Sequence, residues 1–178
     1  TITPSALTGG TFNPSNYAIT YVSGALTVNK APLTITANSF TKTYGDTITL
    51  TGNEFSISGL KNSETTSSAT LTTTGAVATA PYSSTPYSIT PSAVTGANGF
   101  NTSNYTIGYS NGTLTVNKAN LTVTGTSSPS KTYDGTDAAS IRGGTLVGIQ
   151  NGDSITLTQG GTYSSVNAGN NISITMTD

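Results

Sequence analysis

The sequence predicts an all-β protein made of tandem modules of about 90 residues, each a small β-sandwich or a β-grasp-like unit, arranged end to end as a rod. Two observations predict this class. Short segments alternate apolar residues with Thr or Ser, which is the period-two pattern of a half-buried strand. The chain also repeats itself with a period of about 88 residues, which suits a small domain better than a solenoid turn. Ile2 matches Ile89, and Tyr44 matches Tyr133.

The alternating segments place aliphatic side chains on one face and hydroxyl groups on the other, and their β-branched residues favour strands. Asn-Gly and Ser-Gly turn signals separate several of them. Because Asn-Gly favours the positive φ angles of a tight turn, Asn111 and Gly112 predict a hairpin between residues 105–109 and 114–116. We expect about half of the chain in strands. The predicted strands include residues 18–21, 26–28, 33–36, 48–50, 105–107, 114–116, 121–124, 154–158 and 172–176.

Helical signals are scarce. The one candidate is residues 60–67, which have room for about two turns at most. Their Ser and Thr residues argue as well for a loop, because hydroxyl side chains compete for backbone hydrogen bonds. A helix there would make the module β-grasp-like.

The predicted joints between modules are short. Residues 28–33 and 116–121 connect one strand pattern to the next without a Gly/Ser spacer. Pro32 removes a backbone donor and restricts the first joint. Short joints of this kind predict a stiff rod instead of a flexible string of domains.

The composition excludes several functions. Charged residues are 7% of the chain and the formal net charge is -1, so we expect no nucleic-acid partner. The chain contains neither Cys nor His, which removes thiol nucleophiles, disulfides and the commonest catalytic base. No run of about 18 apolar residues is present, so we expect no direct membrane insertion. We therefore predict that the protein is not an enzyme and holds no cofactor.

Two strings at the predicted joints point to a family. They are LTVNKAPLTITANSFTKTYGD at residues 26–46 and LTVNKANLTVTGTSSPSKTYDG at residues 114–135. Both resemble the joints of MBG and YDG repeats, found in large bacterial surface or secreted adhesins, often of the filamentous-haemagglutinin type. MBG modules of the YGX type run from K-x-Y-G through G-L-x-x-x-[DE]-T to Y-x-I…G-x-L-x-V-x-K-A. The matching residues are Lys42, Tyr44, Gly45, Gly59, Leu60, Glu64, Thr65, Tyr105, Ile107, Gly112, Leu114, Val116, Lys118 and Ala119.

A YDG module carries K-x-Y-D-G-T followed by G-x-x-x-G-D-S, and both elements have counterparts here. On this resemblance, residues 1–30 are the C-terminal part of an MBG-like module, 31–118 a complete one, and 119–178 the N-terminal part of a YDG-like module. We expect that the two terminal parts, which together amount to about one period, complement each other within the chain or between chains. The matching YDG residues are Lys131, Tyr133, Asp134, Gly135, Thr136, Gly148, Gly152, Asp153 and Ser154.

The K-x-Y motif occurs twice, and we interpret it as structural. The tyrosine is expected to pack into the module core, while the Gly-Asp or Asp-Gly pair makes a turn. The motif residues are Lys42, Tyr44, Gly45 and Asp46 in the first copy, and Lys131, Tyr133, Asp134 and Gly135 in the second.

A calcium site is a weaker interpretation of three aspartates than ordinary turn formation. Asp134, Asp137 and Asp153 fall in one predicted module, and calcium takes several oxygen ligands from loops. The sequence has no D-x-D-x-D-G loop, so we favour ordinary turn chemistry for these aspartates.

Five Asn-x-Ser/Thr sequons are candidate glycosylation sites, in a chain whose richness in Asn and Thr produces some sequons by chance. Certain secreted adhesins of the resembled type are modified at such sites. The five asparagines are Asn101, Asn104, Asn111, Asn120 and Asn171.

The resemblance implies secretion, tandem repetition and an adhesive or scaffolding role at the bacterial cell surface, with no enzyme activity and no single agreed ligand. We expect a non-catalytic stalk or fibre segment whose partners are the neighbouring modules of the same chain. One alternative is an adhesive module that contacts glycan or host protein through exposed tyrosines such as Tyr82 and Tyr87 or through a pocket. Another is a filament that assembles head to tail by strand complementation.

Overall fold

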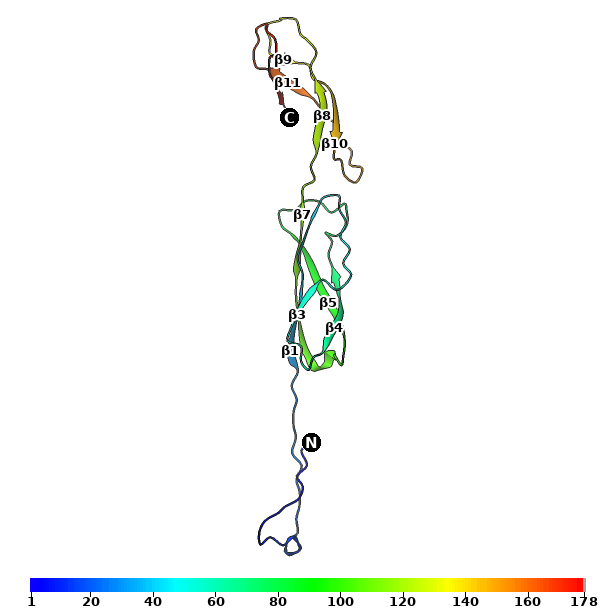
Figure 1. Cartoon of the computed structure of the whole chain (residues 1–178), viewed down its shortest axis with the longest axis vertical. Coiled ribbons are helices and arrows are strands. Elements are labelled where there is room, and N and C mark those ends of the chain that lie inside the picture. Colours follow the sequence, from blue (N-terminus) through cyan, green and yellow to red (C-terminus); the bar gives the residue numbers. More distant parts are fainter. Residues whose placement is uncertain (178) are drawn as a thin grey trace.

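The structure is a computed structural model that describes residues 1–177. It is all-β, as predicted, with 39% of residues in strands and 3% in helix. The strand content is below the expected half because residues 1–30 contain no strand. Figure 1 places residues 1–30, a central pair of sheets and a C-terminal group of strands one after another along the long axis.

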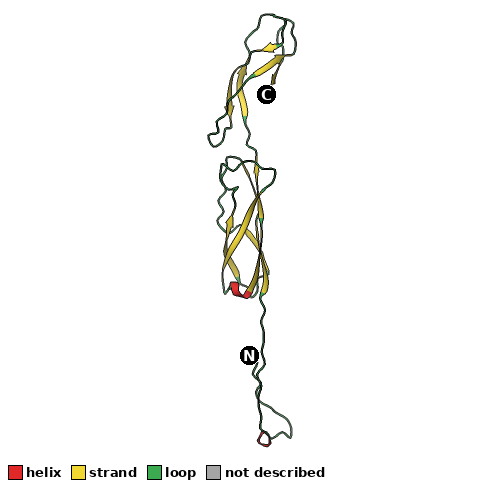
Figure 2. Cartoon of the chain, turned by 180° about the vertical axis from the view of Figure 1, so that it is seen from behind, coloured by secondary structure: helices red, strands yellow, loops and turns green. Residues whose placement is uncertain are grey.

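Residues 31–117 form two packed sheets, which we call the central sandwich (Figures 1 and 2). One sheet has the strand order β3-β1-β6 and the other β2-β7-β5-β4. The strands are β1 (Ala31–Ala37), β2 (Phe40–Thr43), β3 (Phe55–Ser58), β4 (Thr65–Thr72), β5 (Tyr87–Ala97), β6 (Tyr105–Ser110) and β7 (Gly112–Asn117).

The core of the central sandwich lies between the two sheets. Leu33 and Ile35 of β1 pack with Ala69 of β4, Val94 of β5 and Tyr105 of β6. A second cluster joins Ala37 of β1, Ile89 of β5 and Leu114 of β7. The alternation read from the sequence produces this arrangement, because every second residue of β1 and β7 points inward.

Two long stretches of chain pass from one sheet to the other without reversing direction. β1 continues into β2, and β6 continues into β7. The two stretches run parallel to each other, since β1 pairs in parallel with β6 and β2 pairs in parallel with β7. The opening and closing segments of the central sandwich are therefore held side by side along their whole length.

The predicted hairpin at Asn111 and Gly112 is wrong. β6 and β7 belong to different sheets, and the chain crosses between the sheets at Asn111. The glycine is needed for close approach instead of for a positive φ. A Cβ added to Gly112 would lie 2.3 Å from the carbonyl oxygen of Asn38 and 2.6 Å from that of Ala37.

The helix considered for residues 60–67 is also absent. Asn62 and Ser63 have φ angles of 53° and 58°, in the left-handed region that a right-handed helix excludes. They form a turn, after which β4 begins at Thr65. Without this helix the β-grasp-like alternative fails, and the sandwich remains.

Residues 119–177 form a second group of strands, which we call the C-terminal unit. β8 (Thr122–Ser127) pairs with β10 (Arg142–Val147) in one sheet, and the other sheet has the order β12-β11-β9. Its remaining strands are β9 (Ala138–Ala139), β11 (Gly160–Tyr163) and β12 (Ile174–Thr177).

Four predicted strands are not strands in the structure. The peptide N–H of Ile48 donates to the carbonyl of Ala76 at 3.0 Å, but residues 48–50 form no ladder. Residues 18–21, 26–28 and 154–158 likewise belong to no sheet. An alternating sequence has the capacity to form a strand, but a ladder requires a partner that offers its own backbone groups.

Residues 1–30 hold only a short 3₁₀ turn, η1 (Pro14–Asn16), and one antiparallel bridge between Ile2 and Gly24. The side chain of Asn13 caps η1 by accepting from the N–H of Ser15 at 3.1 Å. A matching 3₁₀ turn, η2 (Thr102–Asn104), precedes β6 in the central sandwich. Residues 1–30 thus keep the 3₁₀ turn of the repeat but not its strand pairing.

Gly112→Ala tests the crossing between the sheets. Because the added methyl group meets backbone oxygens, which cannot rotate away, we expect a loss of about 2–3 kcal/mol in the free energy of unfolding. Urea denaturation followed by tyrosine fluorescence measures it. Gly10→Ala is the matched control, since an added Cβ meets no atom within 4 Å there. Equal midpoints for the two variants would contradict the crossing.

Candidate functional site

The first K-x-Y motif lies at the end of the central sandwich that faces the C-terminal unit. Lys42 is its buried member, with 5% of its surface exposed. Its Nζ donates to the carbonyl oxygen of Asp46 at 2.9 Å and to that of Val77. Burial lowers the pKa of Lys42, and the charge of Asp46 partly offsets this effect. Lys42 therefore ties the β2 turn to the loop that contains Val77.

The turn itself matches the prediction. The N–H of Asp46 donates to the carbonyl of Thr43 at 3.0 Å, and the Asp46 carboxylate accepts from the N–H of Thr43 at 3.1 Å. Gly45 supplies the required positive φ of 102°.

The predicted core position of Tyr44 is wrong. Tyr44 belongs to neither core cluster, and its hydroxyl donates to the carboxylate of Asp153, at 3.1 Å from Oδ1 and 3.0 Å from Oδ2. Since Asp153 belongs to the C-terminal unit, the motif tyrosine contacts the next part of the chain. We call the contact region around this pair the junction.

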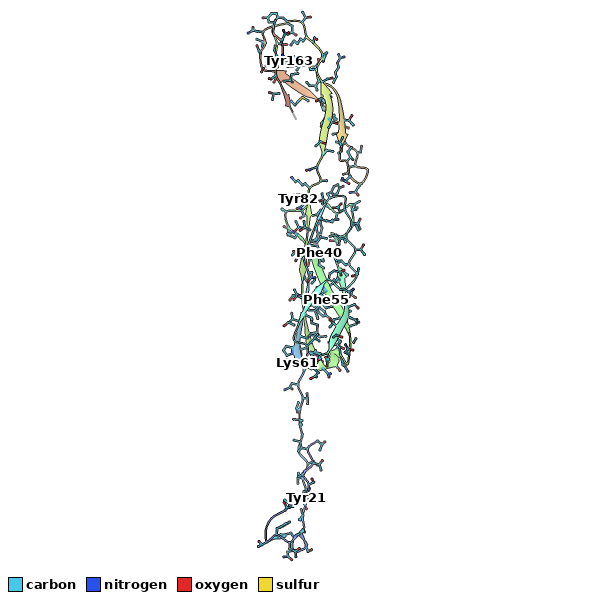
Figure 3. The ribbon with its side chains drawn as sticks, viewed as in Figure 1. Tyr21, Phe40, Phe55, Lys61, Tyr82 and Tyr163 are labelled. Atoms are coloured by element: carbon cyan, nitrogen blue, oxygen red, sulfur yellow. The ribbon has the colours of Figure 1, made fainter. Side chains whose placement is uncertain are left out.

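Further contacts complete the junction. The Nδ2 of Asn151 donates to the carbonyl oxygen of Ala78 at 3.1 Å. Lys118 Nζ lies 5.0 Å from the centroid of the Tyr82 ring, within the range of a cation–π contact. Figure 3 labels Tyr82 where the central sandwich meets the C-terminal unit. Two segments of the central sandwich, the turn after β2 and the loop between β4 and β5, thus contact the residues that follow it.

A groove of about 470 Å³ lies at the junction. Apolar residues of both the central sandwich and the C-terminal unit line this groove, together with the carboxylate of Asp153 and the ammonium group of Lys118. The lining residues that bear on function are Tyr44, Tyr82, Lys118, Leu121, Ile149 and Asp153.

The second K-x-Y motif, in the C-terminal unit, is more exposed to solvent than the first. Lys131 Nζ lies 2.9 Å from Asp134 Oδ1 and also donates to the carbonyls of Thr136 and Ala138. The hydrogen bond from Lys131 and those from Thr136 lower the pKa of Asp134 to about 2. Tyr133 is exposed, so its predicted place in a core is wrong as well.

The turn in this second motif is as predicted. The N–H of Thr136 donates to Asp134 Oδ1 at 2.9 Å, and Gly135 has a φ of 75°. The motif in both copies is therefore a lysine-anchored turn that presents a tyrosine at the surface.

The structure does not bring the three calcium candidates together. Asp134 pairs with Lys131, whereas Asp153 accepts from Tyr44 at the junction. In residues 1–177, no group of three or more acidic side chains has the geometry to hold a metal ion.

The five sequon asparagines are all exposed. The side chain of Asn101 accepts from the N–H and the hydroxyl of Ser103, at 3.0 Å and 2.6 Å. Asn171 has a φ of 56° in the C-terminal unit. Accessibility therefore permits glycosylation at each of the five.

One hydrogen bond between two motif residues was not predicted from the sequence. The hydroxyl of Tyr105, in the core, donates to Glu64 Oε2 at 2.6 Å and accepts from the N–H of Lys61 at 3.0 Å. The hydrogen bond to Glu64 and burial raise the pKa of Tyr105. Both residues belong to the motif quoted above, but 41 residues of sequence separate them and hide the contact.

The sequence predicts some residues of the junction better than others. Period two places Lys42 on the same face as Phe40, so its inward direction was readable from the sequence. The contacts of Asn151 with Ala78 and of Lys118 with Tyr82 have no such signal, because they depend on how two separately folded parts meet.

The described residues contain no helix long and apolar enough to cross a membrane. The sheets and the junction define a class: a protein of consecutive all-β domains that contact each other through polar residues at a short joint. The chain carries an MBG domain of the YGX type, matched over residues 33–115, directly followed by a YDG domain, matched over residues 117–178. No curated protein and no solved structure matches the chain.

Tyr44→Phe tests the junction. It removes the hydroxyl that donates to the Asp153 carboxylate, so we expect backbone amides of residues 148–153 to exchange about fivefold faster, equivalent to about 1 kcal/mol. Hydrogen–deuterium exchange measures this. Tyr21→Phe, which changes a tyrosine in residues 1–30, is the control and should leave the loop unchanged. Identical exchange in both variants would mean that the junction contact contributes nothing.

Proposed function

We propose that this chain is a non-catalytic structural segment of a bacterial extracellular adhesin or matrix protein, which acts as a stalk that holds other domains at a distance. The observation that carries the proposal is the junction. The MBG domain ends at Asn117 in β7 and the YDG strand β8 begins at Thr122, which leaves little free linker. The hydrogen bonds of Tyr44 and Asn151 then fix one domain against the next.

The surface chemistry supports the same role. Only 7% of the residues are charged, so few surface interactions depend on salt. The polar surface is instead made of Thr, Ser and Asn, which are uncharged and remain hydrated over a wide range of pH. A stalk outside the cell, exposed to changing salt and pH, benefits from both properties.

The roles of the acidic side chains in the described part of the chain support a non-catalytic role. The acidic side chains at the junction and in the K-x-Y turns bond to Tyr, Lys or backbone groups that hold the fold together. A general acid–base pair needs a titratable group with a shifted pKa that faces a site for substrate. The pKa of Asp134 is lowered to about 2, but the causes are the hydrogen bond from Lys131 and those from Thr136 in the turn.

Small-angle scattering extrapolated to zero concentration tests the stalk. We expect a rod profile whose maximum dimension stays the same between low and roughly 0.5 M salt and with added calcium, because the junction has few ionic contacts. Tyr44→Phe should broaden the distribution of domain orientations while each domain stays folded. A wild-type profile that requires freely rotating domains would rule out the stiff stalk.

A second candidate is direct binding of glycan or peptide in the junction groove. Tyr82 is half exposed there beside apolar residues from the YDG domain, as an adhesive pocket requires. It ranks second because Lys118 already lies over the Tyr82 ring.

Binding to a glycan array tests the groove. If it binds a ligand, Tyr82→Ala should lower the signal at least about tenfold, the loss of one stacking contact with its surroundings. Tyr133→Ala, an exposed tyrosine outside the groove, is the control. Equal signals from the wild type and Tyr82→Ala would exclude this site.

A further inference from the structure

The chain enters and leaves the MBG domain at opposite ends of one strand ladder. β1 begins at Ala31, which lies opposite Tyr105 of β6 in a parallel pair. β2 ends at Thr43, which lies opposite Asn117 of β7 in a second parallel pair. Figure 1 shows β1 toward one end of the domain and β7 toward the other. The opening and closing strands are therefore direct neighbours whose outer ends point away from each other.

This arrangement decides how a pulling force along the chain acts on the domain. Such a force draws Ala31 toward the N-terminus of the chain and Asn117 toward its C-terminus. Because the paired strands are parallel, the two pulls run along the strands in opposite directions and load the ladder in shear. The hydrogen bonds of a parallel ladder are evenly spaced, so they share the load instead of breaking one after another.

The core resists the same sliding motion. Leu33 and Ile35 of β1 and Leu114 and Val116 of β7 are at most 1% exposed. Since side chains alternate between the two faces of a strand, sliding by one residue turns the whole buried face outward. Moving the opening and closing strands past each other therefore exposes these side chains to water and breaks backbone hydrogen bonds at the same time.

A side chain joins the two stretches where they cross between the sheets. Strand pairing stops at Thr36 in β1 and resumes at Phe40 in β2. Between these residues, Ser39 Oγ accepts from the N–H of Thr113 at 3.0 Å and from its hydroxyl at 3.1 Å. The ladder is thus bridged at the one place where its backbone pairing is interrupted.

The ladder is also secured where the chain leaves the domain. Beyond the last strand pair, the N–H of Tyr44 donates to the carbonyl oxygen of Asn117 at 2.9 Å. Lys42 points into the domain, where its Nζ donates to the carbonyl oxygens of Asp46 and Val77. The end of β2 is therefore tied both to β7 and to the loop that contains Val77.

We propose that the MBG domain is a force-bearing unit whose mechanical resistance comes from this parallel ladder, residues 31–43 against residues 105–117, which we call the clamp. β3, β4 and β5 lie between the two halves of the clamp in the chain, so they bear load only after the clamp has opened. The inference does not depend on the stalk role, because it concerns one domain and the stiff stalk concerns the joint between two.

Single-molecule force spectroscopy on the whole chain tests the clamp by changing only the direction of pulling. The chain has no native cysteine, so two introduced cysteines define where the handles attach. Asn29→Cys with Asn120→Cys loads the clamp in shear. Thr47→Cys with Asn120→Cys pulls apart two neighbouring strand ends, since Thr43 lies opposite Asn117, and peels the clamp open pair by pair. All three substituted positions are exposed.

We expect the shear geometry to need at least about twice the force of the peeling geometry at one loading rate, because forced unfolding depends on the barrier that the pulled bonds present. An added length of roughly 25 nm identifies the MBG domain in both geometries, since an extended residue spans about 3.5 Å. The two double variants should have the same urea midpoint, which excludes a difference in stability as the cause.

Ser39→Ala tests the bridge in the middle of the clamp. It removes the oxygen that accepts from Thr113, so the domain should unfold about fivefold faster at a constant shear force, as expected for one lost hydrogen bond. Ser68→Ala is the matched control. It removes a hydroxyl that lies 2.9 Å from that of Thr95, between β4 and β5, outside the clamp, and should change the rate by less than about twofold.

Equal forces in the shear and peeling geometries would overturn the proposal, because the direction of the ladder would then have no effect on resistance. Equal effects of Ser39→Ala and Ser68→Ala would overturn it too, because resistance would then be spread over all strand pairs. Neither result bears on the stalk: equal forces together with a rod profile in scattering would mean a stiff joint between domains that have no clamp.

Discussion

The fold of the MBG domain depends on the parallel pairing of its first and last strands. β1 and β2 open the domain, and β6 and β7 close it about 70 residues later. Every fully buried large side chain of the core belongs to these strands or to β5. Because neither half buries its apolar face alone, the core forms only when segments distant in sequence meet.

This constraint explains the contrast between the three parts of the chain. Where opening and closing strands meet, Leu33, Tyr105 and Leu114 are buried. Where closing strands are alone, as in residues 1–30, the same pattern yields no sheet and exposed apolar residues. Where opening strands are alone, as at β8 and β10, the sheet forms but its face remains open. Hydrophobic alternation supplies a face, and only a partner strand buries it.

The junction also involves a motif of the repeat, but side-chain hydrogen bonds form it and strand pairing does not. Lys42 anchors the turn from inside the domain, which leaves Tyr44 free to reach the next domain. The motif therefore has one buried cation and one outward tyrosine, the reverse of the usual positions of the two residue types. A lysine in this place is satisfied by carbonyl oxygens, so its burial is tolerated.

The sequence by itself determined the all-β class, the repeat, the strands β1, β6 and β7, and the turns of both K-x-Y motifs, because these depend on local alternation and on residues such as Gly45 that permit a positive φ. Only the tertiary structure decided that β6 and β7 lie in different sheets, that Glu64 accepts from Tyr105, and that Tyr44 faces Asp153. Such facts depend on which distant segments meet. The local sequence pattern does not specify which segments pair, since any alternating strand can pair with several others in either direction.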